Sequence, residues 1–169
     1  MKISARNQGG NFTPAPAGTT QGVLVDIIDL GKRPDRFNPG EEVHQMQLAF
    51  QLEDEMDNGE PFVVRTFPLR ASLNPKSKLF QTITAMRGKI TDEELDEEGD
   101  FDLDSLIGTN CLVTVEQTEK EGGKIYANVT SVSQLPKKNK TVLEPRNYVR
   151  VQDREERPVE GSDGEEVPF

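Results

Sequence analysis

The chain has 169 residues and a formal net charge of −10, and only 33% of its residues are hydrophobic. This length allows one domain of ordinary size together with segments that do not join a core. No apolar run reaches the roughly 20 residues of a membrane span, and no charged-then-apolar leader opens the sequence, so we expect a cytoplasmic protein. The single cysteine, Cys111, excludes an intrachain disulfide, and one cysteine with one histidine makes no zinc site.

The acidic residues are concentrated in two segments. Residues 92–104 contain nine acids and no base, and residues 153–169 contain seven acids and two arginines. Removing the −9 and the −5 of these segments from the total of −10 leaves +4 for the rest of the chain. The body of the protein is therefore mildly basic, which is compatible with nucleic-acid binding.

The first half of the chain predicts three strands. Residues 1–21 contain several glycines and prolines without a periodic apolar pattern, which predicts a flexible N-terminal arm. Residues 22–30 are a β-branched run that predicts a first strand, and residues 31–42, with two prolines, predict a loop. Residues 43–52 alternate between apolar and polar side chains, which is typical of a half-buried strand. Residues 62–69 predict a third strand.

A helix and two more strands follow. Asn74 is a suitable N-cap for a helix over residues 75–87, in which Leu79, Ile83 and Met86 recur at helical spacing. Residues 91–107 begin with a capping-box pattern and predict a short acidic helix. Residues 110–116 and 125–132 predict two strands joined by a glycine turn.

This order of elements predicts a mainly β protein. Five strands with a helix between the third and the fourth are typical of the oligonucleotide/oligosaccharide-binding (OB) barrel, here with an acidic helical insertion. We expect the barrel to span residues 22–136, after the arm of residues 1–21. Residues 137–169 then form a linker and a disordered acidic tail, with a weak sixth strand at residues 148–151.

An OB barrel binds single strands through cations that contact phosphates and through rings that stack on bases. The candidate DNA-binding residues come from the first loop, the third strand, the ends of the helix and the last hairpin: Lys32, Arg33, Arg36, Phe37, Arg65, Phe67, Arg70, Lys76, Lys78, Arg87, Lys89, Lys124 and Tyr126. For Phe67 and Tyr126, packing in the core is as good an interpretation as stacking on a base. The lysines at the ends of the helix are more simply interpreted as an ordinary solvent-exposed surface. His44 is expected to be an ordinary strand residue.

Catalytic patterns are absent from the sequence. The nine acids of residues 92–104 do not follow the spacing of a calcium loop. There is no phosphate-binding glycine loop and no recognisable nucleophile–histidine pattern. We therefore expect no enzymatic activity, no cofactor and no metal, and we interpret the acidic segment as a solvated cap or an electrostatic shield.

Several short stretches carry a family resemblance between Phe12 and Pro136. They include Pro14-Ala15-Pro16-Ala17-Gly18, Asp26-Ile27-Ile28-Asp29-Leu30-Gly31, Glu60-Pro61-Phe62-Val63-Val64, Lys76-Ser77-Lys78-Leu79, Arg87-Gly88-Lys89, Thr91-Asp92-Glu93-Glu94-Leu95, Leu106-Ile107-Gly108 and Tyr126-Ala127-Asn128-Val129. In these stretches the chain resembles bacteriophage-encoded OB-fold single-stranded DNA-binding proteins. The resemblance implies binding of single-stranded DNA during phage replication or recombination, in the cytoplasm of the host cell. The chain has no tryptophan and does not resemble the core of the cellular bacterial proteins.

The C-terminal residues are acidic and end on an aromatic side chain: Asp163, Glu165, Glu166, Val167, Pro168 and Phe169. This ending is similar to the C-terminal tip of bacterial single-stranded DNA-binding proteins. The similarity implies that these residues bind partner proteins of replication or recombination, with Phe169 in an apolar pocket and its α-carboxylate beside a cation. The sequence leaves self-association open. An alternative function is an acidic DNA mimic that inhibits a host DNA-handling enzyme, which the two acidic segments favour and the basic body disfavours.

Overall fold

The computed structural model describes residues 13–139 and 141–154, which form a mainly β structure with one α-helix. The strands and the helix are, in chain order, β1 (Gly18–Pro34), β2 (Glu42–Glu55), β3 (Pro61–Thr66), β4 (Leu69–Arg70), α1 (Lys78–Arg87), β5 (Asn110–Glu119) and β6 (Ile125–Ser133). Within these two ranges, no helix is long and apolar enough to cross a membrane.

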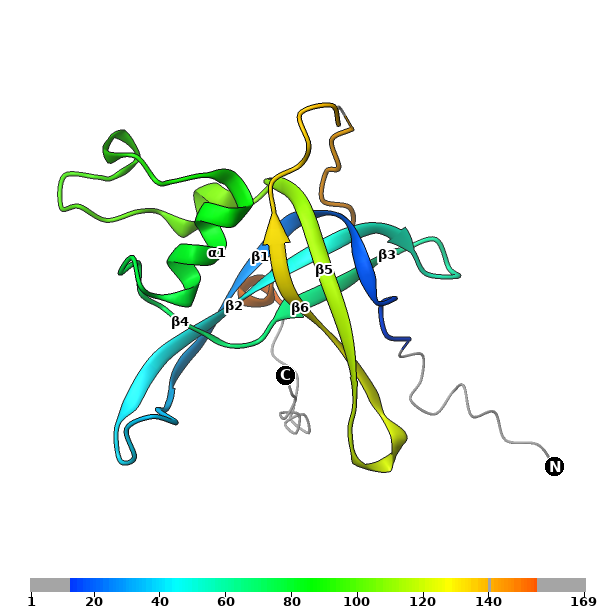
Figure 1. The fold of residues 1–169 in the computed structure, drawn as a ribbon, viewed down its shortest axis with the longest axis horizontal. Coiled ribbons are helices and arrows are strands. Elements are labelled where there is room, and N and C mark those ends of the chain that lie inside the picture. The colour runs from blue at the N-terminus through cyan, green and yellow to red at the C-terminus, as the bar shows by residue number, and fades with distance from the viewer. Residues whose placement is uncertain (1–12, 140, 155–169) are drawn as a thin grey trace.

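Five of the strands close into a barrel (Figure 1). β1 pairs with β2 and β5, β2 pairs with β3, and β5 pairs with β6, all antiparallel. Parallel pairing of β3 with β6 closes the circle, and the two-residue β4 extends the sheet beside β2. The predicted mainly β barrel is confirmed. The strand predicted at residues 148–151 is wrong, because this part of the chain is irregular and leads into a short 3₁₀-helix at Val151–Asp153.

Strands β1 and β2 are longer than their sequence patterns predict. β1 begins at Gly18, inside the predicted arm, and continues to Pro34, inside the predicted loop. The pairing of β1 with β2 continues to its last pair, Pro34 with Glu42. Proline is tolerated at this position because the end of a strand does not need a further ladder hydrogen bond. The connecting loop is therefore short, and the two strands form a long hairpin.

The acidic segment between α1 and β5 contains two short 3₁₀-helices, Asp92–Glu94 and Leu103–Leu106, where the sequence predicted a short acidic helix. The capping box predicted for Thr91 and Glu94 is present. The backbone N–H of Thr91 donates to Glu94 Oε1 at 2.8 Å.

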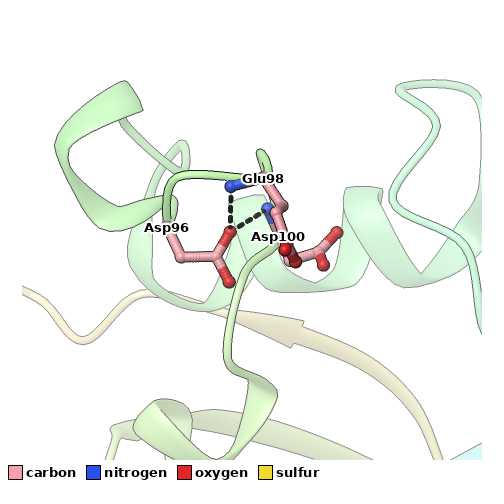
Figure 2. A group of neighbouring side chains, drawn as sticks. All are labelled: Asp96, Glu98 and Asp100. Atoms are coloured by element: carbon pink, nitrogen blue, oxygen red, sulfur yellow. Dashed lines mark hydrogen bonds between the residues drawn. The ribbon is translucent and has the colours of Figure 1, made fainter.

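Three acidic side chains gather in the turn between these two 3₁₀-helices (Figure 2). The carboxylate oxygens of Asp96, Glu98 and Asp100 lie within 4.8 Å of one another, and all three side chains are exposed. Asp96 Oδ1 accepts the backbone N–H of Glu98 at 2.8 Å and that of Asp100 at 2.9 Å. Asp96 therefore closes the turn.

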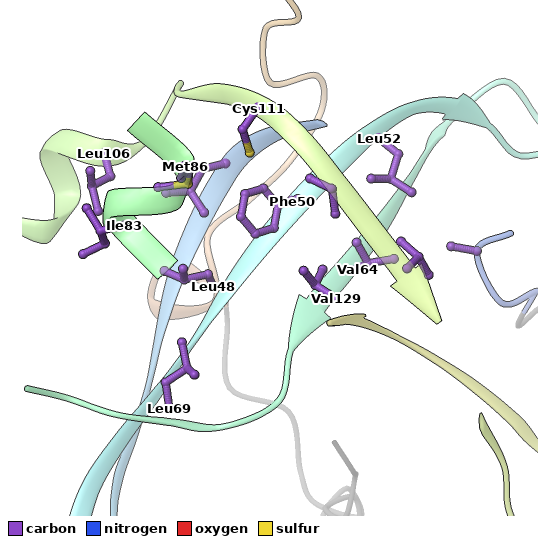
Figure 3. Close-up of a cluster of buried hydrophobic side chains, with 14 of the residues drawn as sticks. Leu48, Phe50, Leu52, Val64, Leu69, Ile83, Met86, Leu106, Cys111 and Val129 are labelled. Atoms are coloured by element: carbon purple, nitrogen blue, oxygen red, sulfur yellow. The ribbon is translucent and has the colours of Figure 1, made fainter. Parts of the chain in front are cut away.

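Apolar side chains from all five barrel strands and from α1 fill the interior (Figure 3). Leu48 and Phe50 of β2 are fully buried, as the alternation of that strand predicts. Burying one side chain of this size contributes about 1.5–3 kcal/mol to folding. Cys111 lies in the same core, and burial raises the pKa of its thiol to about 12. Cys111 is therefore packed as a small buried hydrophobic residue.

Helix α1 packs against β4, β5 and β6. Its buried face consists of the three residues predicted from helical spacing: Leu79, Ile83 and Met86. The N-cap is Ser77, whose hydroxyl accepts the N–H of Phe80 at 3.1 Å. Asn74, the predicted N-cap, instead accepts the N–H of Lys76 at 2.9 Å and closes the turn before the helix. The helix therefore begins three residues later than predicted.

Residues 141–154, here called the C-terminal strap, pack on the outside of the barrel, behind it in the view of Figure 1. Its apolar side chains join a second cluster on the outer face of β1 and β2, formed by Leu143, Tyr148, Val151, Val23, Val25, Ile28 and Ala49. The strap lies within residues 137–169, which were predicted to form a linker and a tail. It explains why Gln51, on the predicted polar face of β2, is buried.

Side-chain amides hold the first half of the strap. Gln51 Nε2 donates to the carbonyl oxygen of Arg146, and the N–H of Arg146 donates back to Gln51 Oε1, both at 2.8 Å. Asn110 makes the same pair of bonds with the backbone of Leu143, at 2.9 and 2.8 Å. Each amide thus supplies the donor and the acceptor that a neighbouring strand would supply.

The second half of the strap is held by Asp26, which has no exposed surface. Its carboxylate accepts the hydroxyl of Tyr148 at 2.7 Å, Nε of Arg150 at 3.0 Å and the N–H of Val151 at 2.9 Å. Burial by itself raises the pKa of Asp26, but these three donors outweigh it and the pKa is lowered. Asp26 is therefore charged at neutral pH and fully satisfied.

Candidate nucleic-acid interface

Two hairpins extend beyond the barrel on the same side of the view in Figure 1, and β3 ends between them. One is formed by β1 and β2 and the other by β5 and β6. Most of the predicted DNA-binding residues lie on these hairpins or between them, so they define the candidate interface.

The tip of the β1–β2 hairpin is organised by Asp35, which is 8% exposed. Its carboxylate accepts the N–H of Phe37 at 2.9 Å, Nδ2 of Asn38 at 2.9 Å and a guanidinium nitrogen of Arg70 at 3.1 Å. The hydrogen bond from Asn38, followed by that from Phe37, lowers the pKa of Asp35. Arg70 therefore supports the loop from β4, and its charge is paired with Asp35.

An exposed ring stands beside a cation at this tip. Phe37 is 82% exposed, and the guanidinium carbon of Arg36 lies 5.9 Å from the centre of the ring. Lys32 and Arg33 are exposed at the end of β1, opposite His44 and Val43 of β2. The hairpin thus brings three cations and one aromatic ring together in solvent.

The β5–β6 hairpin carries a second pair of this kind. Lys120 Nζ lies 5.9 Å from the centre of the Tyr126 ring, which is partly exposed. The N–H of Lys120 donates to the carbonyl of Lys124 at 2.7 Å, which fixes the turn, and Lys124 is exposed. Gly122, with a φ of 84°, adopts a backbone conformation that other residues rarely take.

A cavity of about 260 Å³ lies where β3 ends. Its lining residues come from the β3–β4 connection, α1 and β6: Thr66, Phe67, Leu69, Lys78, Thr82, Val129, Thr130, Ser131 and Val132. Phe67 is 48% exposed and therefore is not a core residue. The cavity brings together Phe67 and Lys78, two predicted site residues that are eleven positions apart in the sequence.

Arg65 has a different environment from Phe67, although the sequence places the two residues on one strand face. Arg65 is half-buried on β3, and this burial lowers the pKa of its guanidinium, with Tyr148 and Arg154 of the strap among the charges that act on it. Phe67 lies beyond the end of β3 and lines the cavity. Arg65 therefore lies near the strap, whose apolar side chains cover β1 and β2, whereas Phe67 lies at the cavity.

The remaining predicted residues do not join this interface. Arg87 is half-buried, forms an ion pair with Glu94, and lies 6.0 Å from the centre of the Phe101 ring. Its contacts tie the end of α1 to the acidic segment. Lys76 and Lys89 are exposed before and after α1. The predicted partner-binding residues Asp163, Glu165, Glu166, Val167, Pro168 and Phe169 lie outside the described residues.

Two features of the structure are absent from the sequence-based predictions. Lys120 is not among the predicted DNA-binding residues, although its ammonium group lies beside the Tyr126 ring. The strap was missed entirely, although Asp26 signals it. An acid within the apolar run of residues 22–30 requires a partner if it is buried, and no cation lies within that run.

No protein-family model matches this sequence, and no curated protein matches it significantly.

Proposed function

We propose that the protein is an OB-fold protein that binds single-stranded DNA with little sequence preference. The strand connectivity supports the fold: β1, β2, β3, β5 and β6 form the closed barrel, and α1 precedes β5. OB folds bind oligonucleotides with the loops between their first two and their last two strands. Here these loops are the tips of the β1–β2 and β5–β6 hairpins.

The observation that carries the proposal is a ring beside a cation on each hairpin. Arg36 accompanies Phe37, and Lys120 accompanies Tyr126. A nucleotide offers a flat base and a charged phosphate, so one such pair can stack on the base while its cation contacts the phosphate. The acidic segment does not oppose this, because its residues lie between α1 and β5, outside the two hairpins.

The test compares single-stranded with double-stranded DNA. Fluorescence anisotropy with labelled oligo(dT), a mixed-sequence single strand and a duplex of equal length should show binding of both single strands and much weaker binding of the duplex at low salt. Comparable affinity for dT and the mixed sequence supports binding without sequence preference. Failure to bind either single strand at low salt would refute the proposal.

We further propose that the acidic tip recruits replication or recombination proteins, as its similarity to bacterial single-stranded DNA-binding proteins implies. Deleting Val167–Phe169 should leave oligo(dT) affinity unchanged and abolish the pull-down of partner proteins. Exchanging Ser162 for alanine, which keeps every predicted partner-binding residue, provides the control. Unchanged pull-down by the deleted protein would contradict recruitment.

A second candidate function is DNA mimicry. The nine acids of the segment 92–104 are all exposed, which presents a dense negative surface. A mimic of this kind should bind a DNA-handling enzyme and no DNA, so the anisotropy experiment separates the two functions. We propose no catalytic role for the protein.

A further inference from the structure

We propose that the cavity at the end of β3 is a subsite that receives one nucleobase of the bound strand. The inference rests on the proposed function and deepens it, because it assigns one part of the interface to a single base and its adjacent phosphate. The cavity volume is about 260 Å³, slightly below the roughly 300–1,000 Å³ of pockets that hold whole small-molecule ligands. It suits a single ring system.

The walls of the cavity match the two kinds of surface that a base presents. Phe67, Leu69 and Val132 provide apolar surface, and the half-exposed Phe67 ring is available for stacking on the face of a base. Thr82, Thr130 and Ser131 line the same space. The hydroxyls of Thr82 and Thr130 already donate to the carbonyls of Lys78 and Thr114, so they can accept a hydrogen bond from the polar edge of the base.

The edge of β6 adds main-chain hydrogen-bonding groups. β6 pairs with β3 only through Asn128 and Val129. In the described part of the chain no strand pairs with this edge after Val129, where Thr130, Ser131 and Val132 line the cavity. An unpaired strand edge presents both N–H and C=O groups, so it can bond to the edge of any base. This is consistent with binding that depends on a base without selecting its identity.

The position and charge of the cavity favour a nucleotide as the occupant. Lys78 lines the cavity and is exposed, so its ammonium group can contact a phosphate next to the inserted base. In Figure 1, β3 ends between the two hairpins that carry the Arg36–Phe37 and Lys120–Tyr126 pairs. The cavity lies at this end of β3, so we expect a strand bound to both hairpins to run near it.

The experiment scans an oligonucleotide for the position that requires a base. The probe is the shortest oligo(dT) that binds with full affinity, which limits slippage of the register, and each position in turn is replaced by an abasic spacer. Wild-type protein should show one position where the spacer weakens binding most, by roughly 5- to 140-fold, the equivalent of one stacked base.

Substitutions then connect that position to the cavity. Phe67→Leu should weaken binding of intact oligo(dT) by a similar factor and remove the extra sensitivity at that position, whereas Phe67→Tyr should preserve it. Thr82→Leu, which fills the cavity from α1, should also remove the sensitivity. The control is Val63→Ala, since Val63 is similarly exposed (42%) on β3 and does not line the cavity. Circular dichroism checks that each variant is folded.

The outcomes separate the subsite from the proposed function. If wild-type protein binds oligo(dT) but Phe67→Leu and Thr82→Leu keep the wild-type affinity and spacer profile, the subsite is refuted and the proposed function stands. The same holds if the spacer profile of the wild type is flat. If wild-type protein binds no single strand at all, both are refuted. If the base contacts the Phe67 ring, the two changes remove the same interaction. The fold-loss of affinity for Phe67→Leu with the abasic oligonucleotide should then be smaller than the product of the two separate fold-losses.

Discussion

Phe37 and Asp26 show how exposure determines the role of a single residue. Phe37 is 82% exposed, so its ring contributes little to folding and is available to a ligand. Asp26 is fully buried in an apolar run of β1, so its charge must be satisfied by the protein itself. The first residue therefore belongs to the candidate interface, and the second belongs to the structure that holds the strap.

Exchanging Phe37 for alanine should weaken single-strand binding and leave stability unchanged. Loss of one stacked base reduces binding by about 1–3 kcal/mol, or roughly 5- to 140-fold. Anisotropy with oligo(dT) measures the affinity, and urea unfolding measures the stability. Val142→Ala is the matched control, because Val142 is 70% exposed and lies on the strap. Equal affinity of wild type and Phe37→Ala would remove Phe37 from the interface.

Asp26 should make stability depend on pH in the acid range. Its pKa in the folded protein is lowered from the ordinary value of 3.8, so its stabilising effect is fully present above that value. The effect is lost as the pH falls below 3.8 and through the folded pKa, because protonation removes the charge that Tyr148, Arg150 and Val151 bind. Urea unfolding of wild type and Asp26→Asn between neutral and acid pH measures this change.

The substitution itself should be costly at neutral pH. Arg150 keeps its ion pair with Asp104 when Asp26 is replaced, but Tyr148 and Val151 lose a charged acceptor. A hydrogen bond to a charged group contributes about 1.5–3 kcal/mol. Asp26→Asn should therefore be less stable than wild type at neutral pH, and the difference should shrink in acid. A constant difference across this range would contradict the assignment. Asp29, Asp35 and Glu94 also have lowered pKa values and remain in both proteins, so the comparison isolates Asp26.

At the scale of elements, the strap and the hairpins divide the outer surface of the barrel between them. The strap covers β1 and β2 with its own apolar cluster and with the amide pairs of Gln51 and Asn110. The β1–β2 and β5–β6 hairpins continue beyond this covered region. If the protein binds a single strand as proposed, the hairpin tips and the cavity at the end of β3 remain available for it.

Exchanging Gln51 for leucine should loosen the strap. The leucine cannot bond to the backbone of Arg146, and leaving one buried polar group unsatisfied costs about 1–3 kcal/mol. The free energy of unfolding should fall by this amount, and amide hydrogen exchange at Arg146 should accelerate. Gln45→Leu is the control, since Gln45 lies on the same strand and is partly exposed. An unchanged exchange rate at Arg146 would show that the amide pair does not hold the strap.

At the scale of the whole molecule, the distribution of charge matters more than the net charge of −10. Nine acids lie in the segment between α1 and β5, whereas both hairpins carry exposed cations. Exposed acids lie near these cations, Glu41 and Glu42 on one hairpin and Glu119 and Glu121 on the other. A bound strand would therefore contact individual cations, not a uniformly positive surface. Each cation that contacts a phosphate releases counterions from the strand.

The affinity for oligo(dT) should therefore fall as salt increases. For single strands the slope of log K against log salt changes by roughly 0.7 for each phosphate contact. Arg36→Ala should make the slope shallower by about this amount. Lys138→Ala should not change the slope, because Lys138 is exposed just before the strap and away from the hairpins. Identical slopes for wild type and Arg36→Ala would show that Arg36 does not contact a phosphate.

Local sequence patterns were sufficient to predict much of the fold. The alternation of residues 43–52 correctly predicted the inner face of β2, and the spacing of Leu79, Ile83 and Met86 predicted the buried face of α1. The boundaries were less accurate. The proline signal ended β1 too early, and Asn74 was chosen as the N-cap in place of Ser77. Both errors arise because Pro34 and Asn74 are acceptable at more than one local position.

Periodicity and the order of charges along the chain were enough to predict the mainly β class, most core-facing residues, the basic body and the acidic segments. The folded structure was needed to show the partners of Asp26 and Gln51, the ion pair of Arg87 with Glu94, and the cavity that Phe67 and Lys78 share. Asp26 and Gln51 bind strap residues far away in the chain, and the other two contacts join residues of different parts of the fold. Local patterns cannot predict them, since the same residue types in the same order are compatible with exposed side chains.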